Sequence, residues 1–297
     1  MTSLLRLALL FLVCTHATSA ADALPNINSV DVDHAQIIFV NVLYKTGDSL
    51  SSYEKQRCHL DLYLPKAGTE KGFATLVWFH GGGLTGGNKD ADSTKKVALG
   101  LAQSGVAVVV PNYRLSPQAK YPAYIEDATA AVAWTLQNIA KHGGDTQRVF
   151  VGGHSAGGYL TLMLGMDTHY LAAFGLKPQQ LAGLIPVSGQ VMTHYTVRQE
   201  RGIGKFSVTA DEAAPVRYAD VKNLPPMLVL CADKDMPARA EENVYLVALM
   251  KGAGNKRVTL QVIADRNHGS VGNNIANKDD PARAAIVKFM ETNKAAK

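Results

Sequence analysis

The fold of this chain is decided by one stretch, Arg148-Val149-Phe150-Val151-Gly152-Gly153-His154-Ser155-Ala156-Gly157. Its apolar residues predict a short buried strand, and the pattern from Ala156 to Met166 predicts a helix. Glycines on both sides of Ser155 suit a turn too sharp for side chains, so the serine hydroxyl is expected to project clear of the strand. A serine presented at such a corner is suited to nucleophilic chemistry.

Short β-like runs alternate with helical patterns along the rest of the chain. Ile37–Tyr44 and His59–Leu64 predict an opening antiparallel pair, because the second run alternates at period two. Continuous apolar runs predict strands buried on both faces, as a parallel sheet requires. These runs are Ala74–Phe79, Val106–Pro111, Val149–Val151, Leu184–Val187, Met227–Leu230 and Val258–Ile263. The helical patterns are Ser93–Ser104, Ala123–His142, Ala156–Met166, Ala238–Gly252 and Pro281–Asn293. The alternation predicts an α/β fold with a mostly parallel central sheet and helices on both faces.

Length and composition fit one exported domain. The chain has 297 residues, 47% of them apolar, which suits one α/β domain and leaves no room for a second. Arg6 precedes the apolar run Leu7–Val13, and small residues lead to Ala20, so residues 1–20 are predicted to be a secretory signal peptide. The run is too short for an uncleaved membrane anchor. Residues 21–297 would then form the domain, in the periplasm or outside the cell.

Charge and cysteine content exclude some partners. Removal of residues 1–20 takes away only Arg6, so the formal charge falls from +5 to +4, and the charges are dispersed. No basic run indicates nucleic-acid binding, and stable membrane insertion is not expected.

Cys58 and Cys231 remain after cleavage. An exported chain could join them, but Cys231 lies in an apolar strand pattern, where a buried free thiol is the commoner interpretation.

Three glycines follow the strand predicted at Ala74–Phe79, in the sequence His80-Gly81-Gly82-Gly83. Glycine lets a backbone turn its N–H groups toward a developing negative charge, as an oxyanion hole requires. We expect Gly82 and Gly83 to be donors, with Gly81 as an alternative, and the N–H of Ala156 to complete the set. A flexible turn is the simpler interpretation, but the position upstream of the serine turn favours an oxyanion loop.

An acid that orients a catalytic histidine is expected at the carboxyl end of a later strand. Met227–Leu230 is followed by Cys231-Ala232-Asp233-Lys234-Asp235-Met236-Pro237, so two aspartates compete. Asp235 lies further along the connection, next to the following helix, where it would reach a histidine. Asp233 would instead accept hydrogen bonds from loop N–H groups. We therefore predict that Asp235 is the acid.

Of the nine histidines, only His268 lies downstream of Asp235. Its neutral imidazole would take the Ser155 proton and then protonate the leaving group. Asp235 would fix the histidine tautomer and stabilise the imidazolium. His80 and His154 adjoin the two glycine motifs, and we expect them to orient or pack against the reacting groups.

Together these residues resemble the α/β-hydrolase superfamily, specifically its esterases with a His-Gly-Gly-Gly oxyanion loop. That group includes hormone-sensitive-lipase-like carboxylesterases and compact bacterial esterases acting on acetylated or feruloylated carbohydrate. The resemblance extends from about His59 to the C-terminus. It includes Pro111-Asn112-Tyr113-Arg114-Leu115-Ser116-Pro117, Tyr121-Pro122-Ala123, Asp127 with Trp134, and Gly143-Gly144-Asp145.

The resemblance implies a serine carboxylic-ester hydrolase that works through an acyl-enzyme, with no cofactor and no metal. Two features depart from the family. Only a short segment precedes the first strand, so the cap is expected to be short or absent. The acid loop reads Asp235-Met236-Pro237, where the family usually has Asp-Pro-Leu. A thin cap favours short acyl or aryl esters of bulky alcohols, with carbohydrate acetyl and feruloyl esters among the candidates.

Two other functions stay open at this point. An arylformamidase or other amidase-type hydrolase would share the same tetrahedral chemistry. A non-catalytic hydrolase-fold binding protein would typically lack the serine, the histidine or the oxyanion glycines, all of which are present. The least regular stretch, Gln190–Asn223, is expected to be a lid or substrate-contacting loop, or else an ordinary surface connection.

Overall fold

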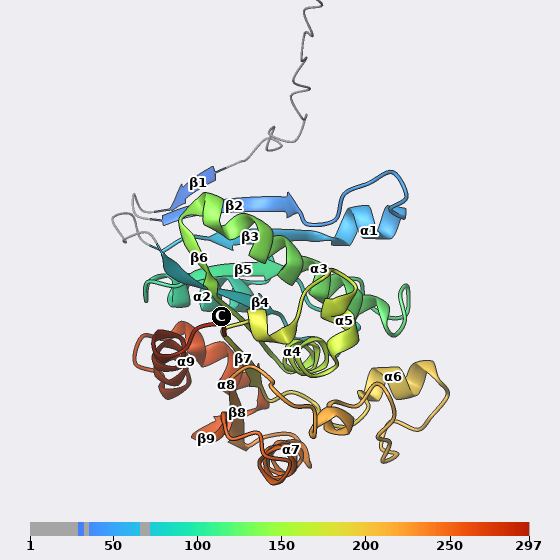
Figure 1. Ribbon diagram of the computed structural model, residues 1–297. Helices are drawn as coiled ribbons and strands as arrows, with labels where there is room; N and C mark the ends of the chain where they lie inside the picture. Colours follow the sequence, from blue (N-terminus) through green and yellow to red (C-terminus); the bar gives the residue numbers. More distant parts are fainter. Residues whose placement is uncertain (1–28, 33–35, 66–71, 297) are drawn as a thin grey trace, which may run out of the picture.

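The computed structural model describes residues 29–32, 36–65 and 72–296, and the signal peptide expected at residues 1–20 lies outside this range. The described part contains a nine-stranded sheet in the order β1-β2-β3-β5-β4-β6-β7-β8-β9 (Figure 1). Its strands are β1 (Ser29–Val32), β2 (Gln36–Leu43), β3 (His59–Tyr63), β4 (Phe73–Phe79), β5 (Ala107–Pro111), β6 (Gly144–His154), β7 (Gly183–Val187), β8 (Met227–Lys234) and β9 (Val258–Asn267).

The sheet has an antiparallel edge and a parallel body. The pairs β1–β2, β2–β3 and β3–β5 are antiparallel, which confirms the expected opening pair of β2 and β3. From β5 to β9 all neighbouring strands are parallel. Every apolar run that predicted a buried strand lies in one of these parallel strands. The predicted α/β fold is therefore confirmed.

Helices cover both faces of the sheet (Figure 1). Side chains along β4 alternate between the two faces, as a pleated strand requires. Leu76 and Trp78 pack in one core with residues of α2 and α9, whereas Val77 and Phe79 pack in the other core with residues of α3, α4 and α7. The helices are α1 (Ser52–Arg57), α2 (Asp92–Ala102), α3 (Ala123–Asn138), α4 (Ala156–Met166), α5 (Thr168–Ala172), α6 (Tyr195–Glu200), α7 (Arg239–Gly252), α8 (His268–Asn273) and α9 (Pro281–Thr292). Short 3-10 turns lie at Ile139–His142, Pro178–Gln180, Pro215–Tyr218 and Asn274–Ala276.

The sequence predicted the long helices α2, α3, α4, α7 and α9 but none of the short ones. α1, α5, α6 and α8 have five or six residues each, too few to show a helical repeat. α6 and the turn Pro215–Tyr218 both lie in the irregular stretch Gln190–Asn223.

Three strands, β6, β8 and β9, extend well beyond their apolar runs. β8 and β9 continue as a pair to Lys234 opposite Asn267. Asp233 is consequently a strand residue and not a loop residue, and His268 is the first residue of α8 rather than part of a loop. Exposed polar residues can extend a ladder through backbone hydrogen bonds alone, and an apolar run does not show this extension.

Cys58 and Cys231 are both free and buried, so they do not pair. Burial raises the pKa of the Cys58 thiol to about 12 and that of Cys231 to about 11. Both thiols therefore stay protonated and unreactive near neutral pH. Among the described residues no helix is long and apolar enough to cross a membrane.

Candidate active site

Ser155 lies at the sharp corner between β6 and α4, as the sequence predicted. Its backbone has φ 58° and ψ −114°, a conformation that few residues other than glycine adopt. The Ser155 N–H donates to the Val187 carbonyl at 2.8 Å, which anchors the corner to β7. The flanking glycines are required by space, because a Cβ on Gly157 would lie 2.0 Å from the Phe79 carbonyl oxygen.

Three side chains form a continuous hydrogen-bonded chain above this corner. His268 Nε2 lies 2.8 Å from Ser155 Oγ, and His268 Nδ1 lies 2.6 Å from Asp235 Oδ1. Because the buried carboxylate can only accept, Nδ1 carries the proton and Nε2 is free to receive one from the serine. The His268 side chain is 21% exposed and that of Asp235 only 1% exposed. The structure thus brings together the three residues that sequence order selected.

Asp235 is held by donors that carry no charge. Ser188 Oγ donates to Oδ2 at 2.5 Å, and the N–H groups of Met236 and Ala232 donate at 2.8 and 3.2 Å. Burial alone would raise the pKa of Asp235, but the hydrogen bonds from His268, Ser188 and Met236 outweigh it and lower the pKa to about 2. The carboxylate is therefore ionised at neutral pH.

Asp233 has a different partner. Its carboxylate accepts the backbone N–H groups of Asp265 and Arg266 at 3.0 and 2.9 Å. These bonds lower the pKa of Asp233 and join the ends of β8 and β9, just before His268. This carboxylate satisfies backbone N–H groups, the duty that the sequence suggested for it.

The two other motif histidines lie beside the site, His80 buried and His154 partly buried. His154 Nε2 donates to the His268 carbonyl oxygen at 2.6 Å, and burial together with the neighbouring His268 lowers the pKa of His154 to about 4. The His80 ring stacks on Tyr113, and burial lowers the pKa of His80 to about 4. Both imidazoles are neutral near pH 7, which suits orienting and packing.

The loop after β4 turns at glycines. Gly82 has φ 114° and Gly83 has φ 64°, and a Cβ on Gly82 would lie 2.3 Å from the Gly86 carbonyl oxygen. Within the described chain, the N–H groups of Gly82, Gly83 and Ala156 have no hydrogen-bond acceptor. These are the three donors that the sequence selected for an oxyanion.

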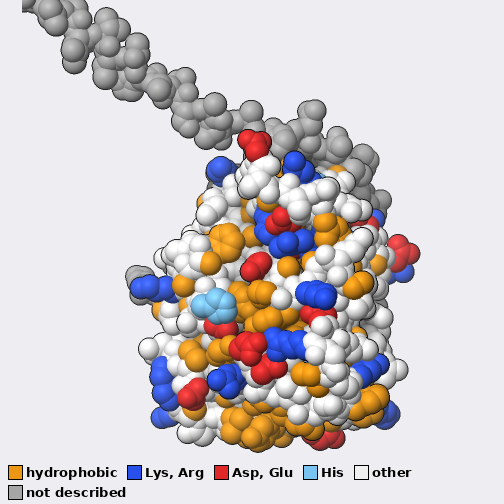
Figure 2. Space-filling model, turned by 90° about the vertical axis from the view of Figure 1, so that its right-hand side faces the viewer, with side chains coloured by type: hydrophobic (Ala, Val, Ile, Leu, Met, Phe, Trp, Pro, Cys, Tyr) orange, Lys and Arg blue, Asp and Glu red, His pale blue; other side chains and the backbone are white. Residues whose placement is uncertain are grey.

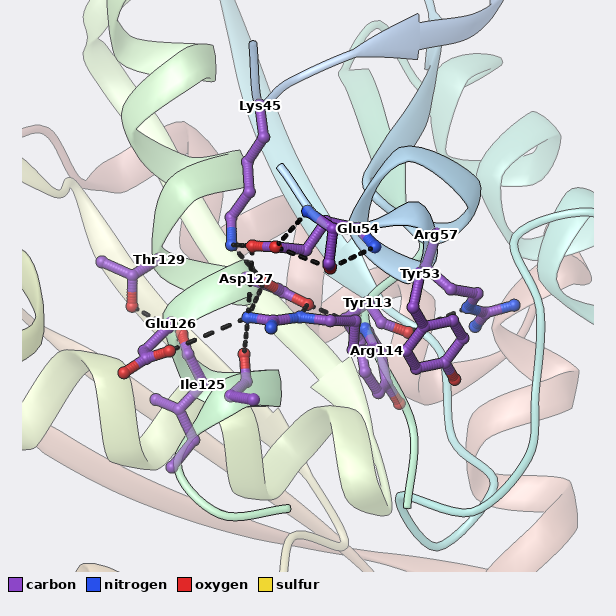
Figure 3. Close-up of polar contacts among 12 residues, drawn as sticks. Lys45, Tyr53, Glu54, Arg57, Tyr113, Arg114, Ile125, Glu126, Asp127 and Thr129 are labelled. Carbon is purple, nitrogen blue, oxygen red and sulfur yellow. Dashed lines mark hydrogen bonds and ion pairs between the residues drawn. The ribbon is translucent and has the colours of Figure 1, made fainter. Parts of the chain in front are cut away.

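An ionic cluster around the buried Asp127 stabilises the segment that contacts this loop (Figure 3). Arg114 donates to both oxygens of the fully buried Asp127 at 2.8 Å, and Lys45 Nζ lies 2.5 Å from the same carboxylate. The cluster fixes the segment after β5 to α3. That segment in turn holds the glycine loop, because the Ser116 N–H donates to the Leu84 carbonyl at 2.8 Å.

The irregular stretch Gln190–Asn223 contacts the site directly. Thr196 Oγ1 in α6 donates to the Gly83 carbonyl at 2.5 Å, and Tyr159 Oη donates to the Ala213 carbonyl at 2.9 Å. This segment is therefore attached to the oxyanion loop and is more than a surface connection. On the side of the molecule where α1 and α6 lie, hydrophobic side chains gather centrally and charged side chains surround them (Figure 2).

The family model described as alpha/beta hydrolase fold matches residues 76–272, more than half of the chain. The chain belongs to the alpha/beta hydrolase fold family. The matched range of this family member contains the serine corner, the glycine loop, Asp235 and His268. Across the described part of the chain, no group of three or more His, Cys, Asp or Glu side chains could hold a metal ion.

Named relatives of this family member are esterases. Carboxylesterase NlhH of Mycobacterium tuberculosis is 32% identical over 149 residues, which covers 49% of this chain but only 41% of the relative. An esterase from Pyrobaculum calidifontis superposes with a TM-score of 0.60 at 26% identity, covering 78% of this chain and 77% of that one. A truncated carbohydrate esterase from gut microbiota superposes with a TM-score of 0.70 at 22% identity, covering 89% and 98%, and this likeness shows the fold.

Sequence reasoning missed two residues of the hydrolase-fold site. Ser188 follows β7 directly, so a polar residue at the carboxyl end of a predicted strand could have marked it. Tyr195 begins α6, a helix too short to be predicted, and its hydroxyl reaches Gly83. No sequence signal predicts this contact, because a stretch without helical or strand periodicity does not show which way its side chains point.

Proposed function

We propose that the protein is a serine carboxylic-ester hydrolase that acts through an acyl-enzyme on short-chain acyl or aryl esters. One observation carries the proposal. The chain Ser155 Oγ, His268 Nε2, His268 Nδ1 and Asp235 Oδ1 is continuous at 2.8 and 2.6 Å. The N–H groups of Gly82 and Gly83 in the glycine loop and of Ala156 at the start of α4 have no acceptor among the described residues. This is the geometry of nucleophile, base, orienting acid and oxyanion donors.

In the first half-reaction, Ser155 Oγ attacks the ester carbonyl carbon while His268 Nε2 takes its proton. The carbonyl oxygen becomes an oxyanion and accepts hydrogen bonds from the N–H groups of Gly82, Gly83 and Ala156. Asp235 stabilises the imidazolium without taking its proton. His268 then protonates the leaving alcohol as the carbon–oxygen bond breaks, which leaves the acyl group on the serine.

In the second half-reaction, water replaces the alcohol. His268 removes a proton from the water as it attacks the acyl-enzyme, and the same oxyanion donors receive the new charge. The proton then returns to Ser155 Oγ as the acid product leaves. No redox partner or metal enters this sequence.

Among esters, we propose those with short acyl groups on bulky alcohols, including acetylated and feruloylated carbohydrates. This choice follows the expectation from the sequence that the cap is short or absent. The likeness to the gut carbohydrate esterase also agrees with it. We further propose export by the signal peptide at residues 1–20, which N-terminal sequencing of the secreted or periplasmic protein would test.

The test compares p-nitrophenyl acetate, p-nitrophenyl decanoate, methyl ferulate and an acetylated xylo-oligosaccharide as substrates. The enzymes are the wild type, Ser155→Ala and, as a matched control, Ser93→Ala on the exposed part of α2. We expect Ser155→Ala to lose about 10⁶-fold in kcat, as for removal of a serine nucleophile elsewhere, and the control to be unchanged. Absence of Ser155-dependent turnover with all four esters would overturn the ester-hydrolase proposal and favour the amidase-type alternative, and turnover that survives in Ser155→Ala would overturn the mechanism.

A further inference from the structure

Tyr195 contacts the glycine loop that holds the expected oxyanion donors. It is the first residue of α6, and a Cβ added to Gly83 would lie only 1.8 Å from its hydroxyl oxygen. The hydroxyl is thus in van der Waals contact with the backbone of Gly83, one of the three expected oxyanion donors. Any other residue in place of Gly83 would displace the Tyr195 side chain.

The hydroxyl of Tyr195 has no hydrogen-bond partner within the part of the chain that the structure describes. Neighbouring tyrosines differ in this respect. Tyr113 Oη donates to the His80 carbonyl at 2.8 Å, and Tyr159 Oη donates to the Ala213 carbonyl at 2.9 Å. Tyrosine hydroxyls that approach the protein interior usually find an acceptor. The Tyr195 hydroxyl therefore keeps its proton available for a ligand.

The ring of Tyr195 is held in place by several contacts. It stacks on His194 with 4.5 Å between ring centroids, and Lys205 Nζ lies 5.2 Å from its centroid. Its backbone N–H donates to Gln190 Oε1 at 3.1 Å. The next residue, Thr196, donates to the Gly83 carbonyl, so the helix and the oxyanion loop are joined directly. The position of the hydroxyl relative to Gly83 is therefore fixed before substrate binds.

We propose that Tyr195 is a catalytic residue whose hydroxyl donates a hydrogen bond to the substrate carbonyl oxygen as it becomes the oxyanion. The proposal rests on the ester-hydrolase function above and adds a side-chain donor to the three N–H groups. The phenol keeps its proton throughout, so the balance of the reaction does not change. A hydrogen bond from a donor that is already held against Gly83 strengthens as charge develops on the carbonyl oxygen, and it lowers the barrier more than it tightens substrate binding.

The test uses Tyr195→Phe, which keeps the ring and removes only the hydroxyl. Its matched control is Tyr245→Phe, a half-exposed tyrosine on α7. Two quantities are measured: kcat and KM for p-nitrophenyl acetate, and the affinity for phenylboronic acid, whose adduct with the serine is tetrahedral. We expect Tyr195→Phe to lose about 10²-fold in kcat and in boronate affinity, as for one oxyanion donor, with KM within about threefold. Tyr245→Phe should match the wild type.

The outcomes separate the two proposals. Equal boronate affinity and kcat in Tyr195→Phe and the wild type would overturn the role of Tyr195 and leave the ester hydrolase intact. A rise in KM with a lower thermal midpoint and unchanged kcat would also overturn it, since that pattern is structural. If the wild type neither binds the boronate nor hydrolyses any ester, and Ser155→Ala behaves identically, the proposed function itself fails and the role of Tyr195 with it.

Discussion

Two buried carboxylates in this protein are neutralised in opposite ways. Asp127 is surrounded by cations, with Arg114 and Lys45 both at hydrogen-bond distance (Figure 3). Asp235, at the end of β8, contacts only neutral donors and the ring of His268. A carboxylate paired with cations is electrostatically satisfied and can serve only the structure. A carboxylate that is held by neutral donors keeps its full negative charge, which can stabilise the imidazolium when the histidine takes a proton.

Two further buried aspartates resemble Asp127, because each pairs with a Lys or Arg side chain. Asp61 pairs with the buried Lys89 at 2.8 Å, and Asp280 pairs with Arg266 at 2.8 Å. Neither contacts a group of the proposed reaction. Burial of a carboxylate therefore does not by itself identify the acid of the proposed reaction. The contact of Asp235 with His268, the histidine that lies 2.8 Å from Ser155, marks it as the candidate acid. Asp167 also has no Lys or Arg partner among the described residues, but its histidine contact is with the exposed His169.

The largest expected effect is that of Asp235→Asn on turnover. An amide in place of the carboxylate removes the charge that stabilises the imidazolium and favours the wrong tautomer, so we expect kcat to fall about 10⁴-fold. The matched control is Asp233→Asn, two residues away, which should stay within about threefold of the wild type. Steady-state kinetics with p-nitrophenyl acetate measures both. A larger loss in Asp233→Asn than in Asp235→Asn would reverse the assignment of the acid.

Asp127→Asn should affect stability rather than chemistry. The substitution removes the buried counter-charge of Arg114 and Lys45 and leaves Glu54 as the carboxylate that both still contact. Breaking a buried pair from one side costs up to about 3–5 kcal/mol of unfolding free energy. Urea unfolding measures the loss, and kcat of the folded fraction should change much less than in Asp235→Asn. Glu126→Gln is the control, because Glu126 is exposed and lies 3.8 Å from the same arginine. A kcat loss comparable with that of Asp235→Asn would contradict a purely structural role for the cluster.

Ser188→Ala is expected to have an intermediate effect. It removes the hydroxyl that donates to Asp235 Oδ2, and a hydrogen bond to a charged group contributes about 1.5–3 kcal/mol. With one donor lost, the pKa of Asp235 should rise and the carboxylate should orient His268 less well, so we expect kcat to fall about tenfold. Ser93→Ala provides the baseline. Unchanged kcat would show that the backbone N–H groups suffice to hold the carboxylate.

The smallest expected effect is on the pH dependence of the unfolding free energy. The pKa of Asp235 is lowered from 3.8 to about 2, so its ionised form stabilises the folded state above the unfolded pKa. That contribution is lost as pH falls through the folded value. The difference in unfolding free energy between wild type and Asp235→Asn should therefore be constant above about pH 5 and shrink between about pH 4 and pH 2. A difference that changes between pH 5 and pH 8 would show that another group is responsible.

Much of the site could be predicted because it follows the chain locally. The Ser155 corner needs glycines beside it, and the strand before it and the helix after it have clear apolar patterns. His268 was selected by order alone, since no other histidine follows the acid. The pairing of β8 with β9 beyond their apolar runs could not be predicted, because exposed polar residues form that ladder through their backbones. The short helices were missed for want of a repeat.

The sequence by itself determined the α/β architecture and pointed to Ser155, His268 and the glycine loop as candidates for the site, since each depends on residue type, spacing or order along the chain. Only the tertiary structure decided how distant segments meet. It placed Asp235 rather than Asp233 against His268, added Ser188 from the connection after β7, left Cys58 and Cys231 unpaired, and set Tyr195 against Gly83. These contacts join residues that are far apart in the chain, and their geometry follows from the packing of the whole sheet rather than from any local pattern.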